Sequence, residues 1–414
     1  MTYIFLGLLI FCAHLFNAWF SRRRIPDVLL LMGIGILAGP VSGWITQEQL
    51  ADVGPVLSSL TLLFILFDSG IDMRLGLVRR YWTSVVQVTL LSYVVSLAAA
   101  TLVCYLIVGL PILASFMLGA IVAGTGAAVV IPLVNQMRVT EKARITLTLE
   151  SAITGVVSIV VTLAVIEGFK MGNVSVPAMF GRVLATIVVS LLIGFAGGIF
   201  WSSMMQKIRK LENSMFLTPA FVFVMYGVTE LLGFSGAIAS LAFGLVLGNP
   251  GHFQIALLRR HKLGDMTPLM DNEKGFFKEF VFFLKTYFFV YIGICIPFTN
   301  GWAFLYGAII AAVLYVARFV LVHFVGKENT PEERLSVSIL IPKGLVAAVL
   351  ASIPEQVNLA AGHNIIPYAS FIKHVAYAVI FCSIIFCSLL VLVTSKRLIV
   401  SVPQKTDVKD AEVD

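Results

Sequence analysis

Charged residues are scarce in this 414-residue sequence, where Asp, Glu, Lys and Arg together make up 12% of the chain. Hydrophobic residues make up 59%, a share well above that of soluble domains. The apolar runs are long and continuous, which excludes the alternating ten-residue pattern of a transmembrane β-barrel. The sequence therefore predicts an all-α polytopic membrane protein, because apolar runs long enough to cross a bilayer recur along the chain.

Cysteine is also sparse, and the five cysteines lie in apolar runs without the spacing of metal ligands. The glycine-rich run GIGILAG (Gly33–Gly39) lies inside an apolar stretch, away from the strand and helix that surround a phosphate-binding loop. A Ser/His/Asp constellation does not stand out either. We expect neither enzymatic activity nor a cofactor, and no metal other than a transported ion.

About thirteen stretches have roughly the 17 to 25 residues that a membrane-spanning helix needs, or are shorter where Gly and Pro interrupt them. They are Tyr3–Phe20, Pro26–Ile45, Val53–Asp72, Ser84–Val108, Ile112–Met137, Ile145–Gly168, Gly181–Met205, Met215–Leu232, Gly236–Asn249, Phe280–Pro297, Trp302–Val325, Leu335–Ile353 and His374–Leu398. We expect residues 1–400 to form a single transmembrane transport domain and residues 401–414 a short cytoplasmic tail.

Most of the 29 basic residues fall in alternate loops, beginning with Arg22, Arg23 and Arg24. Cytoplasmic loops carry the excess of Lys and Arg. The distribution predicts a multi-pass protein of the cell (inner) membrane, with its N-terminus outside and its C-terminus in the cytoplasm. The net charge of +7 is then a topology signal, and we expect no nucleic-acid partner.

Two predicted spans in corresponding positions of the two halves, Ile112–Met137 and Leu335–Ile353, are interrupted by Gly and Pro. The interruptions are Gly119, Gly124, Gly126 and Pro132 in the first span, and Pro342 and Gly344 in the second. Such pairs are typical of inverted repeats with two crossed, discontinuous helices near the bilayer midplane. Unwound backbone at that depth must line a cavity or be buried in protein.

Ionisable residues inside membrane spans are costly and are functional candidates by default. Glu150, Lys343 and Arg318 lie near the depth of the core in the predicted spans. Asp68, Glu230 and Lys285 are further candidates. We expect Arg318 to pair with a carboxylate or a helix end, and Lys285 to extend toward the membrane surface.

Several motifs, in this order and on this number of spans, resemble those of the monovalent cation:proton antiporter superfamily, of the prokaryotic sodium/proton exchanger type. The motifs are SRRRIPDVLLLMGIGILAGP (Ser21–Pro40), LFILFDSGIDMRL (Leu63–Leu75), GAIVAGT (Gly119–Thr125), SGAIASLAFGLVLGN (Ser235–Asn249), FFVYIGI (Phe288–Ile294) and PKGLVAAVLAS (Pro342–Ser352). The resemblance implies a homodimer, with a static dimerisation region and a mobile six-helix core that carries its substrate like an elevator.

The sequence departs from this family at the ion-binding aspartates. The family has Thr-Asp-Pro or Thr-Ser-Pro at the first broken helix, where this chain has Thr125, Gly126 and Ala127. On the next helix Thr154 and Gly155 replace an Asn-Asp pair. The family's glutamate on that helix and its basic residue in the second broken helix are kept, as Glu150 and Lys343.

A cation/proton antiporter needs a carboxylate that binds either a proton or a metal ion, with its pKa raised by burial. Glu150 balanced by Lys343 is one candidate, although these two residues could instead form a structural ion pair. Asp68 could reach the site from another helix. A neutral site of backbone carbonyls and hydroxyl groups is a third alternative. Its hydroxyls would come from Thr125, Thr154, Ser151 and Ser158.

We expect a secondary active transporter that exchanges Na⁺ or K⁺ against protons across the lipid bilayer. The alternative is an anion transporter or anion/proton exchanger on the same fold. Gly126 and Gly155 remove two negative charges while Lys343 stays, which leaves the site more positive and favours an anion. A third alternative is an inactive relative that binds a partner.

Overall fold

The computed structural model of this chain consists of helices and short connecting segments in the residues it describes. These are residues 2–23, 27–46, 48–50, 53–73, 75–136, 139–171, 176–210, 214–253, 267–296, 301–325 and 330–394. The predicted tail, 401–414, lies outside them.

The helices follow one another without strands in the described part of the chain. The first half contains α1 (Thr2–Arg23), α2 (Asp27–Ile36), η1 (Leu37–Val41), η2 (Glu48–Leu50), α3 (Val53–Asp72), α4 (Leu75–Val103), η3 (Cys104–Val108), α5 (Ile112–Ala123), α6 (Ala127–Gln136), α7 (Glu141–Met171) and α8 (Val176–Ile208). The second half contains η4 (Ser214–Phe216), α9 (Leu217–Leu231), α10 (Gly236–Gly248), α11 (Pro250–Phe253), α13 (Asp271–Cys295), α14 (Gly301–Val325), α15 (Pro331–Ile339), α16 (Leu345–Ala361) and α17 (Ala369–Thr394).

Within the described residues, every predicted span overlaps one of these helices or a pair of consecutive ones. Pro26, Met137, Pro297 and residues 395–398, at the ends of four predicted spans, lie outside the described residues. By length and composition, 5 described helices can each cross a membrane unaided, and six shorter apolar helices accompany them. The two spans predicted to be discontinuous are indeed broken, into α5 and α6 and into α15 and α16. The second broken span was predicted to end at Ile353, but α16 continues through Pro354 to Ala361. The helix ends there because Gly362 takes the left-handed conformation, with φ 70°.

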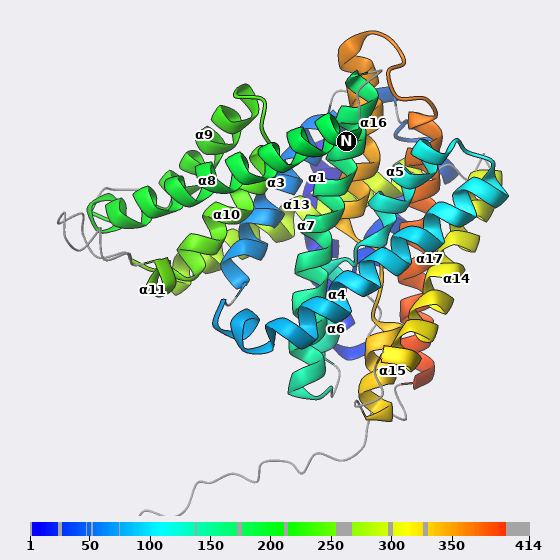
Figure 1. Ribbon diagram of the computed structural model, residues 1–414, viewed down its shortest axis with the longest axis horizontal. Helices are drawn as coiled ribbons and strands as arrows, with labels where there is room; N and C mark the ends of the chain where they lie inside the picture. The colour runs from blue at the N-terminus through cyan, green and yellow to red at the C-terminus, as the bar shows by residue number, and fades with distance from the viewer. Residues whose placement is uncertain are drawn as a thin grey trace, which may run out of the picture.

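One group of helices, called the panel here, consists of α1, α2, α3, α8, α9, α10 and α13 (Figure 1). Glycines bring its backbones into direct contact. A methyl group added at Gly244 on α10 would lie 2.1 Å from the carbonyl oxygen of Phe67 on α3. One added at Gly293 on α13 would lie 2.2 Å from the carbonyl oxygen of Met32 on α2. Such close approach, typical of packed membrane helices, fixes these helices against one another.

The second group, called the core here, consists of α4 to α7 and α14 to α17, which pack extensively on one another. Its backbones are also brought together at glycines. A methyl group added at Gly307 on α14 would lie 2.5 Å from Cβ of Ala378 on α17, and one at Gly119 on α5 would lie 3.1 Å from the carbonyl oxygen of Leu97 on α4. The crossed broken helices therefore lie within a tightly packed unit.

Panel and core meet mainly where α16 packs on α3 and where α7 packs on α8, with smaller contacts of α17 with α2 and of α13 with α16 and α17. The chain first passes from panel to core at the α3–α4 junction, which Asn249 holds. Its Oδ1 accepts from the N–H of Leu75 at 3.0 Å, and its Nδ2 donates to the carbonyl oxygens of Met73 at 2.7 Å and Leu245 at 3.0 Å. One side chain at the end of α10 thus fixes the first of the chain connections between the two units.

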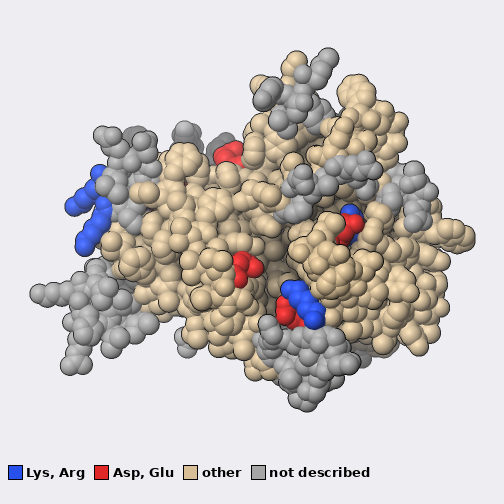
Figure 2. Space-filling model, turned by 90° about the horizontal axis from the view of Figure 1, so that it is seen from above, with Lys and Arg blue, Asp and Glu red and all other residues tan. Residues whose placement is uncertain are grey.

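The surface seen from above carries few charged side chains (Figure 2). They lie in small separate groups on a largely uncharged face, and in some of these groups acidic and basic atoms adjoin. Large apolar side chains are exposed on the outer helices, among them Leu192 on α8, Val224 on α9 and Val316 on α14. Such a surface suits contact with lipid, in keeping with the predicted fold class.

Candidate functional site

The two broken helices cross at their unwound segments, between Ala123 and Ala127 and between Ile339 and Leu345. The N–H of Gly126 donates to the carbonyl oxygen of Pro342 at 2.8 Å. A methyl group added at Gly126 would lie 2.6 Å from Cα of Gly344 and 2.7 Å from its nitrogen. Carbon atoms in contact are normally about 3.5 Å or more apart. Any side chain at position 126 would therefore force the two segments apart.

Lys343 is buried at this crossing, with 1% of its surface exposed. Its Nζ donates to the carbonyl oxygen of Ala123 at 3.1 Å, and its N–H donates to Oγ of Ser383 at 2.9 Å. Ala123 is the last residue of α5, so the ammonium group lies at the negative end of that helix. The charge of Lys343 is balanced in part by this helix end.

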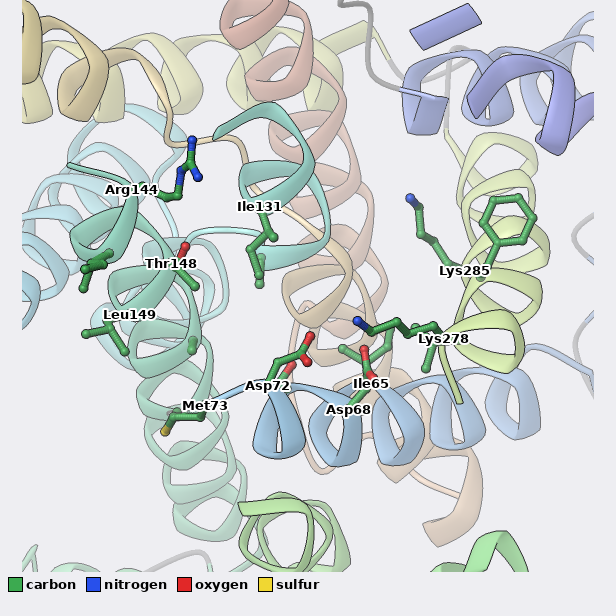
Figure 3. A pocket seen from close by; sticks show the side chains of 16 residues that line it. Ile65, Asp68, Asp72, Met73, Ile131, Arg144, Thr148, Leu149, Lys278 and Lys285 are labelled. Atoms are coloured by element: carbon green, nitrogen blue, oxygen red, sulfur yellow. The ribbon is translucent and has the colours of Figure 1, made fainter. Parts of the chain in front are cut away.

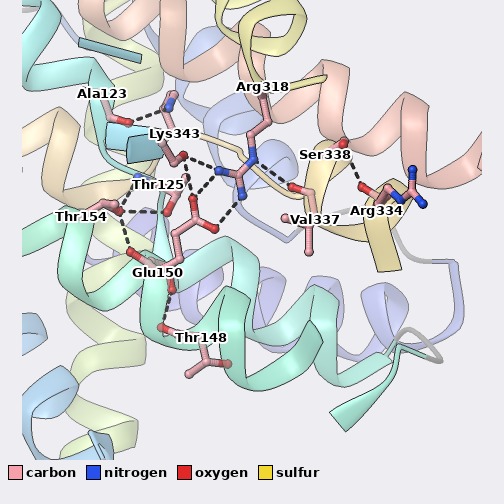
Figure 4. A network of polar contacts seen from close by, with 12 residues as sticks. Ala123, Thr125, Thr148, Glu150, Thr154, Arg318, Arg334, Val337, Ser338 and Lys343 are labelled. Carbon is pink, nitrogen blue, oxygen red and sulfur yellow. Dashed lines mark hydrogen bonds and ion pairs between the residues drawn. The ribbon is translucent and has the colours of Figure 1, made fainter. Parts of the chain in front are cut away.

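Glu150 on α7 forms a bidentate ion pair with Arg318 on α14 (Figure 4). Both N···O distances are 2.6 Å, and the two residues are 1% and 2% exposed. Ser92 on α4 donates to Oε1 of Glu150 at 2.9 Å and accepts from Arg318, whose Nε donates to the carbonyl oxygen of Val337 at 3.1 Å. Both carboxylate oxygens are committed, in the geometry of a strong buried pair.

The ion-pair partner of Glu150 is thus Arg318 and not Lys343, which corrects the pairing considered from the sequence. Arg318 does have a carboxylate partner, one of the two alternatives expected for it. The sequence did not indicate this pair because its members are 168 residues apart. Removing either partner would leave the other charge buried and unpaired, which is strongly destabilising.

The hydroxyl groups considered as neutral ligands are largely engaged with one another. Oγ1 of Thr154 accepts from the N–H of Thr125 at 3.1 Å, lies 3.1 Å from the Thr125 hydroxyl and donates to the carbonyl oxygen of Glu150 at 2.7 Å. Ser151 donates to the carbonyl oxygen of Thr148 at 3.0 Å. Ser158 differs from these residues, since its buried Oγ lies beside the Tyr93 hydroxyl on α4.

Gly155 directly follows Thr154 on α7, and its surroundings differ from those of Gly126. A methyl group added at Gly155 would have only Cγ2 of Val346 nearby, at 3.8 Å, an ordinary contact. Of the two glycines that replace the family's aspartates, Gly126 is therefore required by the crossing, while Gly155 leaves room for Cβ.

A cavity of about 500 Å³ separates panel and core on the side where α3 ends. Its panel wall comes from α3 and α13, and its core wall from α6 and α7, as far as Ala127 beside the crossing. Asp68 and Asp72 of α3 line it, and Figure 3 shows them directed, with Lys278, into the same space. The other ionisable residues of the lining are Arg144 and Lys285.

Asp68 is thus placed in a cavity that reaches the crossing, whereas two other intramembrane candidates have structural partners. Lys285 pairs with Asp27 on α2 at 2.9 Å. Glu230 accepts from the N–H of Gly236 at 2.8 Å, at the start of α10. Asp72 was missed by the sequence reasoning, although its spacing of four residues from Asp68 places both on one face of a helix.

Residues 7–400 match the family described as "Sodium/hydrogen exchanger, transmembrane". The chain belongs to this family, a family of multi-pass integral membrane transporters. The resemblance inferred from the motifs is confirmed.

Named relatives are similar along most of the chain. Na(+)/H(+) antiporter 1 of Methanocaldococcus jannaschii is 25% identical over 366 residues, which cover 84% of this chain and 82% of the relative. The K(+)/H(+) antiporter NhaP2 of Shewanella baltica is 25% identical over 368 residues, covering 87% of this chain and 61% of the relative. The structure of the sodium proton antiporter MjNhaP1 from M. jannaschii at pH 8 superposes with a TM-score of 0.74 at 22% identity, covering 94% and 99% of the two chains. The predicted fold is thereby confirmed.

Proposed function

We propose that this protein is a secondary active antiporter that exchanges a monovalent cation, Na⁺ or K⁺, for protons, and that Asp68 binds cation and proton alternately. The observation that carries the proposal is the cavity between panel and core, which Asp68 and Asp72 line and which extends to Ala127 beside the helix crossing. The relatives named as Na(+)/H(+) and K(+)/H(+) antiporters support the same class of substrate.

Asp68 is preferred to Glu150 because the contacts of the two carboxylates differ. Glu150 accepts two hydrogen bonds from Arg318 and one from Ser92, so a cation would have to displace a buried guanidinium. Asp68 lies on the wall of a cavity and can be reached by an ion from the aqueous side. The Thr125–Thr154 pair is a weaker candidate, since its hydroxyls bond to one another and to the backbone.

Alternating access by an elevator motion of the core is part of this proposal. Close glycine contacts join helices within the panel and within the core, whereas the two units meet over smaller surfaces, chiefly those of α16 on α3 and of α7 on α8. This distribution favours sliding of one unit past the other over deformation within either. The panel would be the dimer interface of a homodimer. With the N-terminus outside, the cavity opens toward the cytoplasm of a cell (inner) membrane.

Anion transport is a second candidate because Lys343 is buried at the crossing, near the starts of α6 and α16, which carry partial positive charge. Two contacts favour the cation reading. The ammonium group of Lys343 already faces the carbonyl end of α5, and the N–H of Gly126 is taken by Pro342. The electrostatic potential at the crossing is therefore less positive, and less favourable for an anion, than the sequence alone indicates.

The test is a proton-flux assay in liposomes that contain the purified protein and a pH-sensitive dye. Na⁺, K⁺ and Li⁺ salts of an impermeant anion are added, and in parallel Cl⁻, HCO₃⁻ and NO₃⁻ salts of an impermeant cation. We expect a pH response to Na⁺ or K⁺ that Asp68→Asn abolishes. Asp271→Asn, at the exposed start of α13, is the matched control and should retain the response.

Glu150→Gln separates the two carboxylate roles. We expect it to lower thermal stability, since Arg318 loses its ionised partner, while cation specificity in the surviving protein is unchanged. A response to the anion series alone would overturn the cation proposal. A cation response that survives Asp68→Asn and disappears in well-folded Glu150→Gln would return the exchanging role to Glu150.

A further inference from the structure

A polar stripe continues along α3 beyond the part that lines the cavity. The stripe contains four polar residues and one apolar residue at intervals of three and four positions: Ser58, Thr61, Ile65, Asp68 and Asp72. On a helix that advances about 100° per residue, these five positions fall within an arc of about 80°. Ile65, Asp68 and Asp72 line the cavity, so Ser58 and Thr61 extend the same face toward the opposite side of the membrane.

Ser58 and Thr61 are buried without a hydrogen-bond partner among the described residues. Ser58 is 1% exposed and Thr61 is 0% exposed. The unpartnered atoms are Oγ of Ser58 and Oγ1 of Thr61. Serine and threonine in helices can bond to the carbonyl of the preceding turn, as Thr229 does with Met225 at 2.7 Å. Buried hydroxyls left unpaired are unfavourable, and two on one face call for an explanation.

Two helices close this end of the stripe, α16 of the core and α13 of the panel. Helix α16 packs on α3, and Leu62, beside Thr61, belongs to a buried cluster that contains residues of both α16 and α13. A methyl group added at Gly54, four residues before Ser58, would lie 2.5 Å from the hydroxyl oxygen of Tyr291 on α13. The half of the stripe near Asp72 faces the open cavity, and the half near Ser58 is closed. A displacement of the core along α3 would close the half near Asp72 and open the half near Ser58.

We propose that Ser58 and Thr61 line the far half of the cation pathway, so that one face of the panel helix α3 forms the fixed wall of the whole route. This inference rests on the proposed cation transport. When the far side opens, the two hydroxyl oxygens contact the cation or its remaining water, and Asp68 receives the ion at the middle of the stripe. Oxygen atoms of hydroxyl, water and carboxylate groups are suitable ligands for a hard cation.

Cysteine accessibility tests the position of the wall independently of transport. Ser58→Cys and Thr61→Cys are made after the five native cysteines have been replaced, and membrane-impermeant maleimide is added from the side opposite the cavity. Leu63→Cys is the control, since Leu63 is buried against the panel cluster about 180° around α3 from the middle of the stripe. We expect labelling at positions 58 and 61 at least ten times faster than at position 63.

The labelling is measured with and without an opposing pH gradient. The proposal is overturned if positions 58 and 61 are labelled as slowly as position 63 under both conditions. If the liposomes show no cation flux while positions 58 and 61 are labelled, the α3 pathway stands and the assignment of its substrate fails. Failure of the inference and failure of the proposed function are therefore distinguishable.

Thr61→Val removes the hydroxyl and keeps the shape of the side chain. We expect the KM for Na⁺ or K⁺ to rise about fivefold with an unchanged or slightly raised melting temperature, because an unpaired buried hydroxyl is lost. Thr89→Val on α4 is the matched control, since Thr89 is equally buried and unpartnered but lies in the core. An unchanged KM in Thr61→Val, or an equal rise in Thr89→Val, would assign Thr61 no role in the pathway.

Discussion

Replacing Gly126 by alanine tests whether the crossing requires glycine. The new methyl group would lie 2.6 Å from Cα of Gly344, so the two segments must separate by about 1 Å to reach normal carbon contact. Overpacking of this kind costs about 1–3 kcal/mol. The same displacement stretches the 2.8 Å bond from Gly126 to Pro342 beyond hydrogen-bond range, at a further cost of about 1 kcal/mol. We expect a loss of about 2–4 kcal/mol.

Gly155→Ala is the matched comparison, because it also replaces one of the two glycines found in place of an aspartate. Its methyl group meets only Val346, at 3.8 Å, and alanine inside a helix is favoured over glycine by about 0.5–1 kcal/mol. The two variants should therefore change stability in opposite directions.

Thermal unfolding of the purified protein in detergent measures both variants. At about 2 °C per kcal/mol, Gly126→Ala should melt roughly 4–8 °C below the unmodified protein, and Gly155→Ala at or slightly above it. Equal melting temperatures for Gly126→Ala and the unmodified protein would refute the close crossing. A large loss in Gly155→Ala would show that position 155 has no free space.

Two further variants address the other polar contacts. Arg318→Lys keeps the charge but loses the planar pair of donors to Glu150, so we expect the free energy of unfolding to fall by about 2 kcal/mol; an unchanged denaturation curve would contradict the bidentate geometry. Asn249→Ala removes the side chain that bonds to Leu75 and Met73, so hydrogen exchange at the Leu75 amide should become at least about tenfold faster. Unaltered exchange there, with Asn249→Asp as the comparison that keeps Oδ1, would mean that the junction is held by other contacts.

The spans and both helix breaks could be predicted from the sequence because they depend on local properties. A run of apolar residues is sufficient to indicate a membrane helix, and Gly124, Gly126 and Pro342 are sufficient to indicate where helices unwind. The order of the family motifs along the chain then indicated how these spans are arranged in one fold. Only the ends of helices such as α16 differ, where tertiary packing carries a helix past a proline.

The contacts of the site could not be predicted, because they join residues that are far apart in the chain. The sequence suggested that Glu150 and Lys343 face each other, but the carboxylate pairs with Arg318, and the lysine with the end of α5. The close approach of Gly126 to Gly344 depends on two segments more than 200 residues apart in the numbering. Asp72 could have been predicted to share the cavity with Asp68, because the two residues are about one helical turn apart.

The panel's long-range contacts have a consequence for how the chain is made. Asp27 of α2 meets Lys285 of α13 across 258 residues, and Asn249 meets Met73 across 176. During synthesis α2 and α3 therefore enter the bilayer long before their partners exist, while α4, α5 and α7, which are close in sequence, can pack at once. The first half of the core should assemble early, and the panel should close only after α13 is inserted. Ribosome-bound chains ending before residue 271 should accordingly leave Asp27 of α2 without its lysine, in a state suited to recognition by membrane quality control.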